Sequence, residues 1–179
     1  MNHSKKGDTS VSGAAMKKIL SVFAFAAVLF LLFACGKDES PSYRSDLTAA
    51  EITSACLSSL SSNALLGSAD EDYIKYRLLP DGTAFESCSV YIQNAGTSID
   101  EIGVIQSTDD DPEALYAAVT DYLSRRNEEW TGQYLVEEYP KLRDAECRSI
   151  GSYVVYAILS EEDKTSFFNA VSELLRTGS

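Results

Sequence analysis

The residue with the most distinctive chemical setting in this 179-residue chain is Cys35, one of four cysteines. It directly follows Ala34 and ends an uncharged, mostly apolar run that begins at Ile19. Two lysines, Lys17 and Lys18, precede this run. Positive charge, then an apolar stretch, then a small residue is the order found in a secretory signal peptide and its cleavage site. The sequence therefore predicts cleavage between Ala34 and Cys35.

The segment Leu32-Phe33-Ala34-Cys35 resembles the lipobox of bacterial lipoproteins, in which the cysteine thiol receives a diacylglyceryl group. Two acyl chains hold a protein on a membrane far more firmly than one. The two alternatives are an ordinary secretory signal, since Phe33 is bulky for its lipobox position, and an uncleaved membrane helix. As a helix, the apolar run would span about 24 Å, less than the ~30 Å hydrocarbon core. We expect residues 1–34 to be a signal peptide, with translation starting at Met1 or Met16.

Histidine chemistry is excluded from the mature chain, because the single histidine, His3, lies in the segment expected to be removed. This excludes the Ser-His-Asp and Cys-His arrangements, histidine general bases and histidine metal ligands. A Ser-x-x-Lys nucleophile is also missing, since no lysine after Cys35 has a serine three residues before it. We therefore predict no catalytic residue, no metal ligand and no cofactor.

Three cysteines, Cys56, Cys88 and Cys147, follow Cys35. They allow one internal disulfide at most. Cys88 and Cys147 fall in predicted strands and would pair if those strands are neighbours. Cys56 lies on an apolar helix face and is expected to be a small buried residue. No two of these cysteines are close enough in sequence for a Cys-x-x-Cys redox or metal motif.

The chain is acidic, with a formal charge of −12, and it becomes more acidic once residues 1–34 are removed, because that segment holds more basic than acidic residues. Nucleic acid is therefore excluded as a partner, since phosphate binding needs basic clusters. The runs Asp70-Glu71-Asp72 and Asp109-Asp110-Asp111 lack the glycine and the twelfth-position glutamate of a calcium-binding EF-hand loop. We expect them to cap helices.

All ten tyrosines and the single tryptophan follow the predicted cleavage site. Aromatic side chains of this kind stack on sugars or anchor protein interfaces. Tyr122, Tyr153 and Tyr156 have the spacing of core residues, which leaves six candidates for an exposed patch: Tyr43, Tyr91, Tyr116, Trp130, Tyr134 and Tyr139. Of these, Tyr91, Trp130 and Tyr134 are our candidates for the binding surface. Tyr91 would lie on the sheet face that we expect to be open.

Hydrophobic periodicity predicts a polar tether over residues 35–46 and a single α+β domain over 47–179. Helix starts are indicated at the Thr48 capping box, at Asp70, at Asp111 with Pro112, and at Ser160.

Strands are indicated by alternation from Phe85 to Ile92 and by apolar residues over Ile102–Gln106, Ala145–Ile150 and Tyr153–Leu159. The resulting order is α-α-β-β-α-β-β-α. Two hairpins would form a four-stranded, mostly antiparallel sheet with helices packed on one face.

The order of these segments is similar to a family of small bacterial lipoproteins defined only as domain of unknown function 4358. The residues that carry the resemblance are the strand Ile99-Asp100-Glu101-Ile102-Gly103-Val104, Glu137-Glu138-Tyr139 with Leu142, and Gly151-Ser152-Tyr153-Val154-Val155. The resemblance covers the mature chain and implies attachment outside the cytoplasmic membrane. It implies no reaction and no catalytic residue, and the three later cysteines are not part of its pattern.

These observations predict a lipoprotein anchored through Cys35 on the outer face of the cytoplasmic membrane, acting as a binding or interaction module of the cell envelope. Its expected ligand is an envelope protein or a small solute. The enzyme alternative is a carboxylate-dependent envelope hydrolase, because paired carboxylates are available among the 27 acidic residues.

Overall fold

The structure is a computed structural model that describes residues 41–61, 66–109 and 111–177. These residues belong to the unit of the chain that starts at Pro41. The expected signal peptide, its cleavage site after Ala34 and the lipidated cysteine lie outside the described residues. The lipid anchor therefore stays a prediction.

Five strands form one antiparallel sheet in the order β1-β2-β3-β5-β4. The strands are β1 (Leu66–Ser68), β2 (Ser87–Gln93), β3 (Glu101–Gln106), β4 (Glu146–Ile150) and β5 (Tyr153–Ile158). The predicted hairpins are present as β2–β3 and β4–β5, and pairing of β3 with β5 joins them. The expected number of four strands is wrong, because β1 adds a fifth beside β2. With three residues, β1 is too short to produce an alternating pattern in the sequence.

The described α-helices are α2 (Ala49–Cys56), α3 (Glu71–Tyr73), α4 (Glu113–Glu128), α5 (Tyr139–Arg143) and α6 (Glu161–Leu175). A π-helical turn, η3 (Ile74–Leu78), continues α3, and a 3-10 turn, η4 (Val136–Glu138), precedes α5. The expected capping box of Thr48 and Glu51 begins α2, and Ser160 caps α6. The Asp111 carboxylate accepts from the Glu113 N–H where α4 starts. Among the helices described, none has both the length and the apolarity needed to cross a bilayer.

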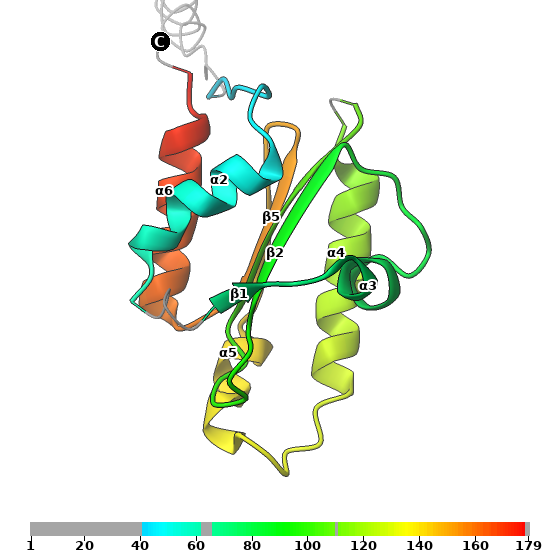
Figure 1. Ribbon diagram of the computed structural model, residues 1–179, viewed down its shortest axis with the longest axis vertical. Coiled ribbons are helices and arrows are strands. Elements are labelled where there is room, and N and C mark those ends of the chain that lie inside the picture. Colours follow the sequence, from blue (N-terminus) through cyan, green and yellow to red (C-terminus); the bar gives the residue numbers. More distant parts are fainter. Residues whose placement is uncertain (1–40, 62–65, 110, 178–179) are drawn as a thin grey trace, which may run out of the picture. The chain divides into compact units, whose positions relative to one another are not determined.

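Helices cover both faces of the sheet, so the expectation of helices on one face is wrong. Figure 1 shows α2 and α6 on one side of the strands and α3 and α4 on the other. The cause lies in β5, where all six residues are apolar and buried. Successive side chains of a strand point to opposite faces, so a continuously apolar strand needs a cover on each. Val155 and Ala157 belong to the core with α2 and α6, and Val154 and Tyr156 to the core with α4.

The two ends of the described unit lie side by side. Tyr43 and Arg176 form an isolated antiparallel bridge. The Arg44 N–H donates to the Leu175 carbonyl at 2.8 Å, and Thr177 continues the contact by donating its N–H to the carbonyl of the residue before Tyr43, at 2.9 Å. The start of the domain is thereby held against the end of α6.

Candidate functional site

The three aromatic residues predicted to form a binding surface do not form one patch. Tyr91 is half-buried in β2 and packs against the core with α2 and α6. Trp130 packs against the core on the α4 side and stacks on Tyr139, with ring centroids 6.0 Å apart. Tyr134 is 66% exposed, and its hydroxyl donates to the Gly96 carbonyl. Tyr91 therefore lies beneath a helix layer and not on an open sheet face, and it faces the opposite side of the sheet from Trp130.

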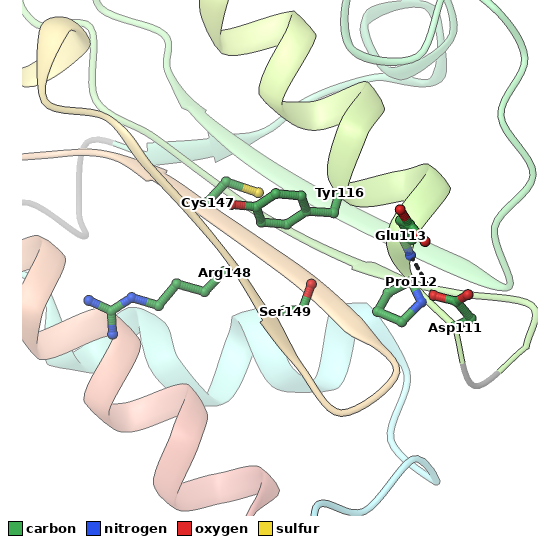
Figure 2. Close-up of a pocket in the computed structure, with 7 residues that line it drawn as sticks. All are labelled: Asp111, Pro112, Glu113, Tyr116, Cys147, Arg148 and Ser149. Atoms are coloured by element: carbon green, nitrogen blue, oxygen red, sulfur yellow. Dashed lines mark hydrogen bonds between the residues drawn. The ribbon is translucent and has the colours of Figure 1, made fainter.

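A groove runs along the outer edge of the sheet, between β4 and α4 (Figure 2). Two hollows of about 610 and 370 Å³ form it, and Tyr116 and Cys147 line both. The first hollow extends past Ser149 to the start of α4, and the second extends toward Glu146 and the C-terminal half of α4. We call this surface the edge groove. Its lining also includes Asp111, Glu113, Thr120, Leu123, Asn127 and Arg148.

The outer side of β4 presents unpaired backbone groups. Residues of an antiparallel strand bond alternately to the neighbour on one side and the neighbour on the other. The Ser107 N–H donates to the Ser152 carbonyl at 2.9 Å, so the backbone groups of Ser152 point toward β3. The next residue, Tyr153, therefore bonds toward β4, where its partner is Ile150. Because the direction alternates along β4, Ile150, Arg148 and Glu146 bond to β5. The N–H and C=O groups of Cys147 and Ser149 therefore point away from β5. No other described strand lies on that side of β4.

The side chains of β4 divide between the two faces of the sheet. Figure 2 shows Cys147 and Ser149 on the side of Tyr116, while Arg148 extends toward α6. The Arg148 guanidinium carbon lies 4.1 Å from the centre of the Phe168 ring. Tyr116 is 39% exposed and forms the apolar wall of the groove. The groove therefore combines an aromatic wall with free backbone donors and acceptors.

The charge of the edge groove is uneven along its length. Arg148 pairs with Glu146 at 2.6 Å, so these two charges largely cancel. Asp111 and Glu113, where α4 begins, have no ion-pair partner among the residues described. The end of the groove beside Ser149 is therefore negative.

The three described cysteines are free thiols. Cys88 lies on β2 and Cys147 on β4, and β3 and β5 stand between them. The condition for the predicted disulfide, that their strands are neighbours, is not met, because two intervening strands exceed the reach of a disulfide. Burial raises the pKa of both thiols to about 12 and that of Cys56 to about 11. They stay protonated at neutral pH, so none is an activated nucleophile.

A buried carboxylate cluster, absent from the sequence-based prediction, lies between β3 and α4. Glu101 is 1% exposed. Its Oε1 accepts from the hydroxyls of Tyr122 and Tyr156, both at 2.7 Å. Its Oε2 accepts from the Tyr73 hydroxyl at 3.0 Å and from the Arg126 guanidinium at 3.4 Å. We call these five residues the Glu101 cluster.

The protonation states in the Glu101 cluster are fixed by burial and by the neighbouring charge. Burial and the Glu101 carboxylate raise the pKa of Tyr73 to about 12 and raise the pKa of Tyr122 and Tyr156 well above the ordinary value. Burial lowers the pKa of Arg126, but its contacts with Tyr122, Glu101 and Tyr73 raise it by more. At neutral pH the phenols stay protonated and donate to Glu101, while the Tyr73 and Tyr122 hydroxyls also accept from Arg126, at 3.1 and 3.3 Å. These bonds hold α3 and α4 on the sheet.

A second polar cluster ties α5 to the segment before β3. Lys141 donates to Asp100 at 2.7 Å and to Glu138 at 2.6 Å. The Ser98 hydroxyl also donates to Glu138, at 2.6 Å. Asp100 and Glu138, like Glu101, belong to the motifs on which the family resemblance depends. Their contacts give those motifs a structural role.

The residues that the structure describes contain no candidate metal site. No three or more cysteine, histidine or carboxylate side chains are placed there to hold a metal ion. Asp70 accepts from the Tyr73 N–H at 2.8 Å, and Asp111 accepts from the Glu113 N–H at 3.0 Å. Asp70 is the N-cap of α3, as expected. The expected N-cap of α4 is wrong by one residue, because Pro112 holds that position and Asp111, whose carboxylate accepts from the Glu113 N–H, precedes it.

The fold is that of an α+β protein with one antiparallel sheet between two helical layers. A family model described as domain of unknown function (DUF4358) matches residues 46–159, which is more than half of the chain. The chain belongs to this family. The match begins just before α2 and ends just after β5, so it includes both strands of the β4–β5 hairpin. No curated protein matches the chain, and no solved structure does.

Proposed function

We propose that this protein is a lipid-anchored binding module of the cell envelope, held outside the cytoplasmic membrane through Cys35 and acting on a partner protein without catalysis. The edge groove is the observation that carries the proposal. It joins an accessible aromatic side chain, Tyr116, to a strand edge with free backbone groups. Exposed sheet edges and aromatic-lined hollows are both common sites of protein recognition.

The edge groove supports binding better than Tyr91, Trp130 and Tyr134, the binding surface predicted from the sequence. Tyr91 and Trp130 are half-buried and already packed within the domain. Tyr134 is exposed, whereas Tyr91 packs beneath α2 and α6, so these residues offer no common surface. Tyr116 lies beside two adjoining hollows and is free to contact a partner.

Site-specific photocrosslinking in intact cells tests this proposal. A benzophenone amino acid replaces Tyr116 in the full-length protein, and the matched control carries it at Tyr76, which is also an exposed tyrosine, at 62%. We expect a discrete, reproducible envelope protein crosslinked at position 116 and absent at position 76. Capture of nothing at position 116, or the same products at both positions, would contradict the proposal.

The same cells test the anchor. Cys35→Ala, combined with the probe at Tyr116, should abolish lipidation and release the protein from the membrane fraction. If the partner is reached only from the membrane surface, the crosslink should be lost as well. Acyl chains retained on the Cys35→Ala protein would contradict the lipoprotein assignment.

A small solute is the second candidate ligand, and a separate hollow supports it. This hollow of about 590 Å³ lies beside η3 and has apolar walls that include Ile74, Leu79 and Phe85. Its volume lies within the range of small-molecule sites. A solute that raises the melting temperature of the full-length protein, but not that of a Phe85→Ser variant, would support this function. A screen of sugars, amino acids and short peptides with no such shift would argue against it.

A further inference from the structure

We propose that the edge groove binds an extended, positively charged peptide segment of its partner by strand addition to β4. This inference rests on the proposed function and names the chemistry that the partner presents. The segment would lie antiparallel to β4 along its open edge, direct alternate side chains into the space between β4 and α4, and place its basic residues beside Asp111 and Glu113.

The backbone of β4 supplies the first argument. Cys147 and Ser149 each direct an N–H donor and a C=O acceptor toward the open side of the strand. An extended chain lying about 4.8 Å from β4 would satisfy all four groups. The opposite edge strand, β1, has three residues and includes Gly67, whereas β4 has five residues and contains neither glycine nor proline. Natural edges are commonly protected by shortness, by proline or by charged side chains. β4 is the longer edge strand and has no proline, and its two charged residues, Glu146 and Arg148, pair with each other.

The groove beside β4 supplies the second argument. Residues of an added strand that lie opposite Cys147 and Ser149 would point to the same face as those side chains, into the hollows lined by Tyr116. The alternate residues would point toward the side of Arg148 and Phe168. The hollows therefore lie where the side chains of an added strand would project, with room for small apolar residues at alternate positions.

Charge selects the occupant. Both acids at the Ser149 end, Asp111 and Glu113, lack ion-pair partners among the described residues, and the whole chain carries a formal charge of −12. A second copy of the chain would bring the same negative charge to the edge, and like charges at close range disfavour pairing. A basic segment is attracted instead. The start of α4 lies beside Ser149, which is near the C-terminal end of β4. In an antiparallel pair this end of β4 lies opposite the N-terminal end of the added segment, so the basic residues should stand there.

Binding of a designed peptide to the full-length protein in detergent tests the inference. The probe is a fluorescent octapeptide, Lys-Lys-Val-Thr-Val-Thr-Val-Thr, followed by fluorescence anisotropy. Its matched controls carry two glutamates in place of the lysines, or N-methyl groups on the alternate backbone nitrogens that would face β4. We expect the lysine peptide to bind, and each control to bind at least about tenfold more weakly, the loss expected for a missing charge-assisted or backbone hydrogen bond.

Protein variants test the same contacts from the other side. Ser149→Pro removes the outward N–H and blocks the approach of a strand, while Ser149→Val keeps the N–H. We expect about a tenfold loss of affinity for the proline variant and none for the valine variant. The pair Asp111→Asn and Glu113→Gln should weaken binding at low salt and reduce its salt dependence. Equal melting temperatures for the two Ser149 variants exclude a folding defect, and if the proline variant does not fold, the N-methylated peptide decides the question.

Several results would overturn the inference. If Ser149→Pro and the N-methylated peptide bind normally, the peptide does not add as a strand. If the glutamate peptide binds as well as the lysine peptide, or neither binds, a basic segment is not the partner. A dimer of the free chain that Ser149→Pro dissociates would identify a second copy as the occupant. A crosslink at Tyr116 in cells, with no peptide binding, would overturn this inference and leave the proposed function standing.

Discussion

Replacement of Glu101 by alanine should destabilise the domain by about 4 kcal/mol, even though it removes a buried charge. The carboxylate accepts hydrogen bonds from three phenols and from Arg126. Tyr73 and Tyr122 can still bond to each other across 2.7 Å once the carboxylate is gone. The Tyr156 hydroxyl, in a residue that is 0% exposed, loses its acceptor.

The magnitude follows from the two groups that lose their partner. A buried hydroxyl without an acceptor costs about 2 kcal/mol. Loss of one member of a buried ion pair costs several kcal/mol, and we take about 2 kcal/mol because the Arg126 side chain is 20% exposed and water can partly solvate it. Glu101→Gln keeps an acceptor for Tyr156 and loses only the charge, so about half of the effect should remain.

Urea unfolding of the two variants measures these effects. For an m-value of about 2 kcal/mol per M, Glu101→Ala should lower the midpoint by about 2 M and Glu101→Gln by about 1 M. The matched control is Glu128→Ala, an exposed residue at the end of α4, which should change the stability by no more than about 0.5 kcal/mol. An unchanged midpoint for Glu101→Ala would refute the reasoning, because it would mean that desolvation of the carboxylate cancels its four hydrogen bonds.

Three further changes have definite expected results. Cys35→Ala should leave the protein without acyl chains by mass spectrometry, and a modified variant would contradict the anchor. Gly103→Ala should cost about 3 kcal/mol by thermal unfolding, because its Cβ would lie 2.0 Å from the Tyr156 ring, and a neutral effect would show that this ring moves freely. Burial raises the pKa of Asp163, but hydrogen bonds from Ser61 lower it by more, below 3.8. The carboxylate therefore stabilises the fold above its unfolded pKa and loses this effect as pH falls through the lower folded value. Asp163→Asn should be less stable than wild type by about 1 kcal/mol at pH 7, and the difference should shrink below pH 3.8 in urea titrations. A constant difference across pH would contradict this assignment.

Local signals in the sequence account for most of the elements. The capping box at Thr48 and the cap at Ser160 mark helix starts because a side-chain oxygen satisfies an N–H of the first turn, which is a short-range interaction. Alternating apolar residues indicated β2, and the predicted hairpin of β2 with β3 is present. The second helical layer was missed, although the unbroken apolar run of β5 was a signal for it.

The candidate site could not be predicted in the same way, because it depends on strand order. The β4–β5 hairpin is visible in the sequence, but nothing local says that β4 lies at the sheet edge or that α4 runs beside it. The Glu101 cluster could not be predicted for the same reason. Tyr73, Tyr122 and Tyr156 come from three elements that are far apart in the sequence, α3, α4 and β5. A charged residue within a strand was the one available signal, and it does not identify its partners.

The bridge between Tyr43 and Arg176 has a topological consequence. Since the chain enters and leaves the domain at the same place, the fold does not depend on which end carries a tether. Figure 1 shows this place at the opposite end of the domain from the segment that joins α4 to α5. A tether joined to either end of the described unit would therefore attach to the domain at the same place and leave the segment between α4 and α5 at the far end.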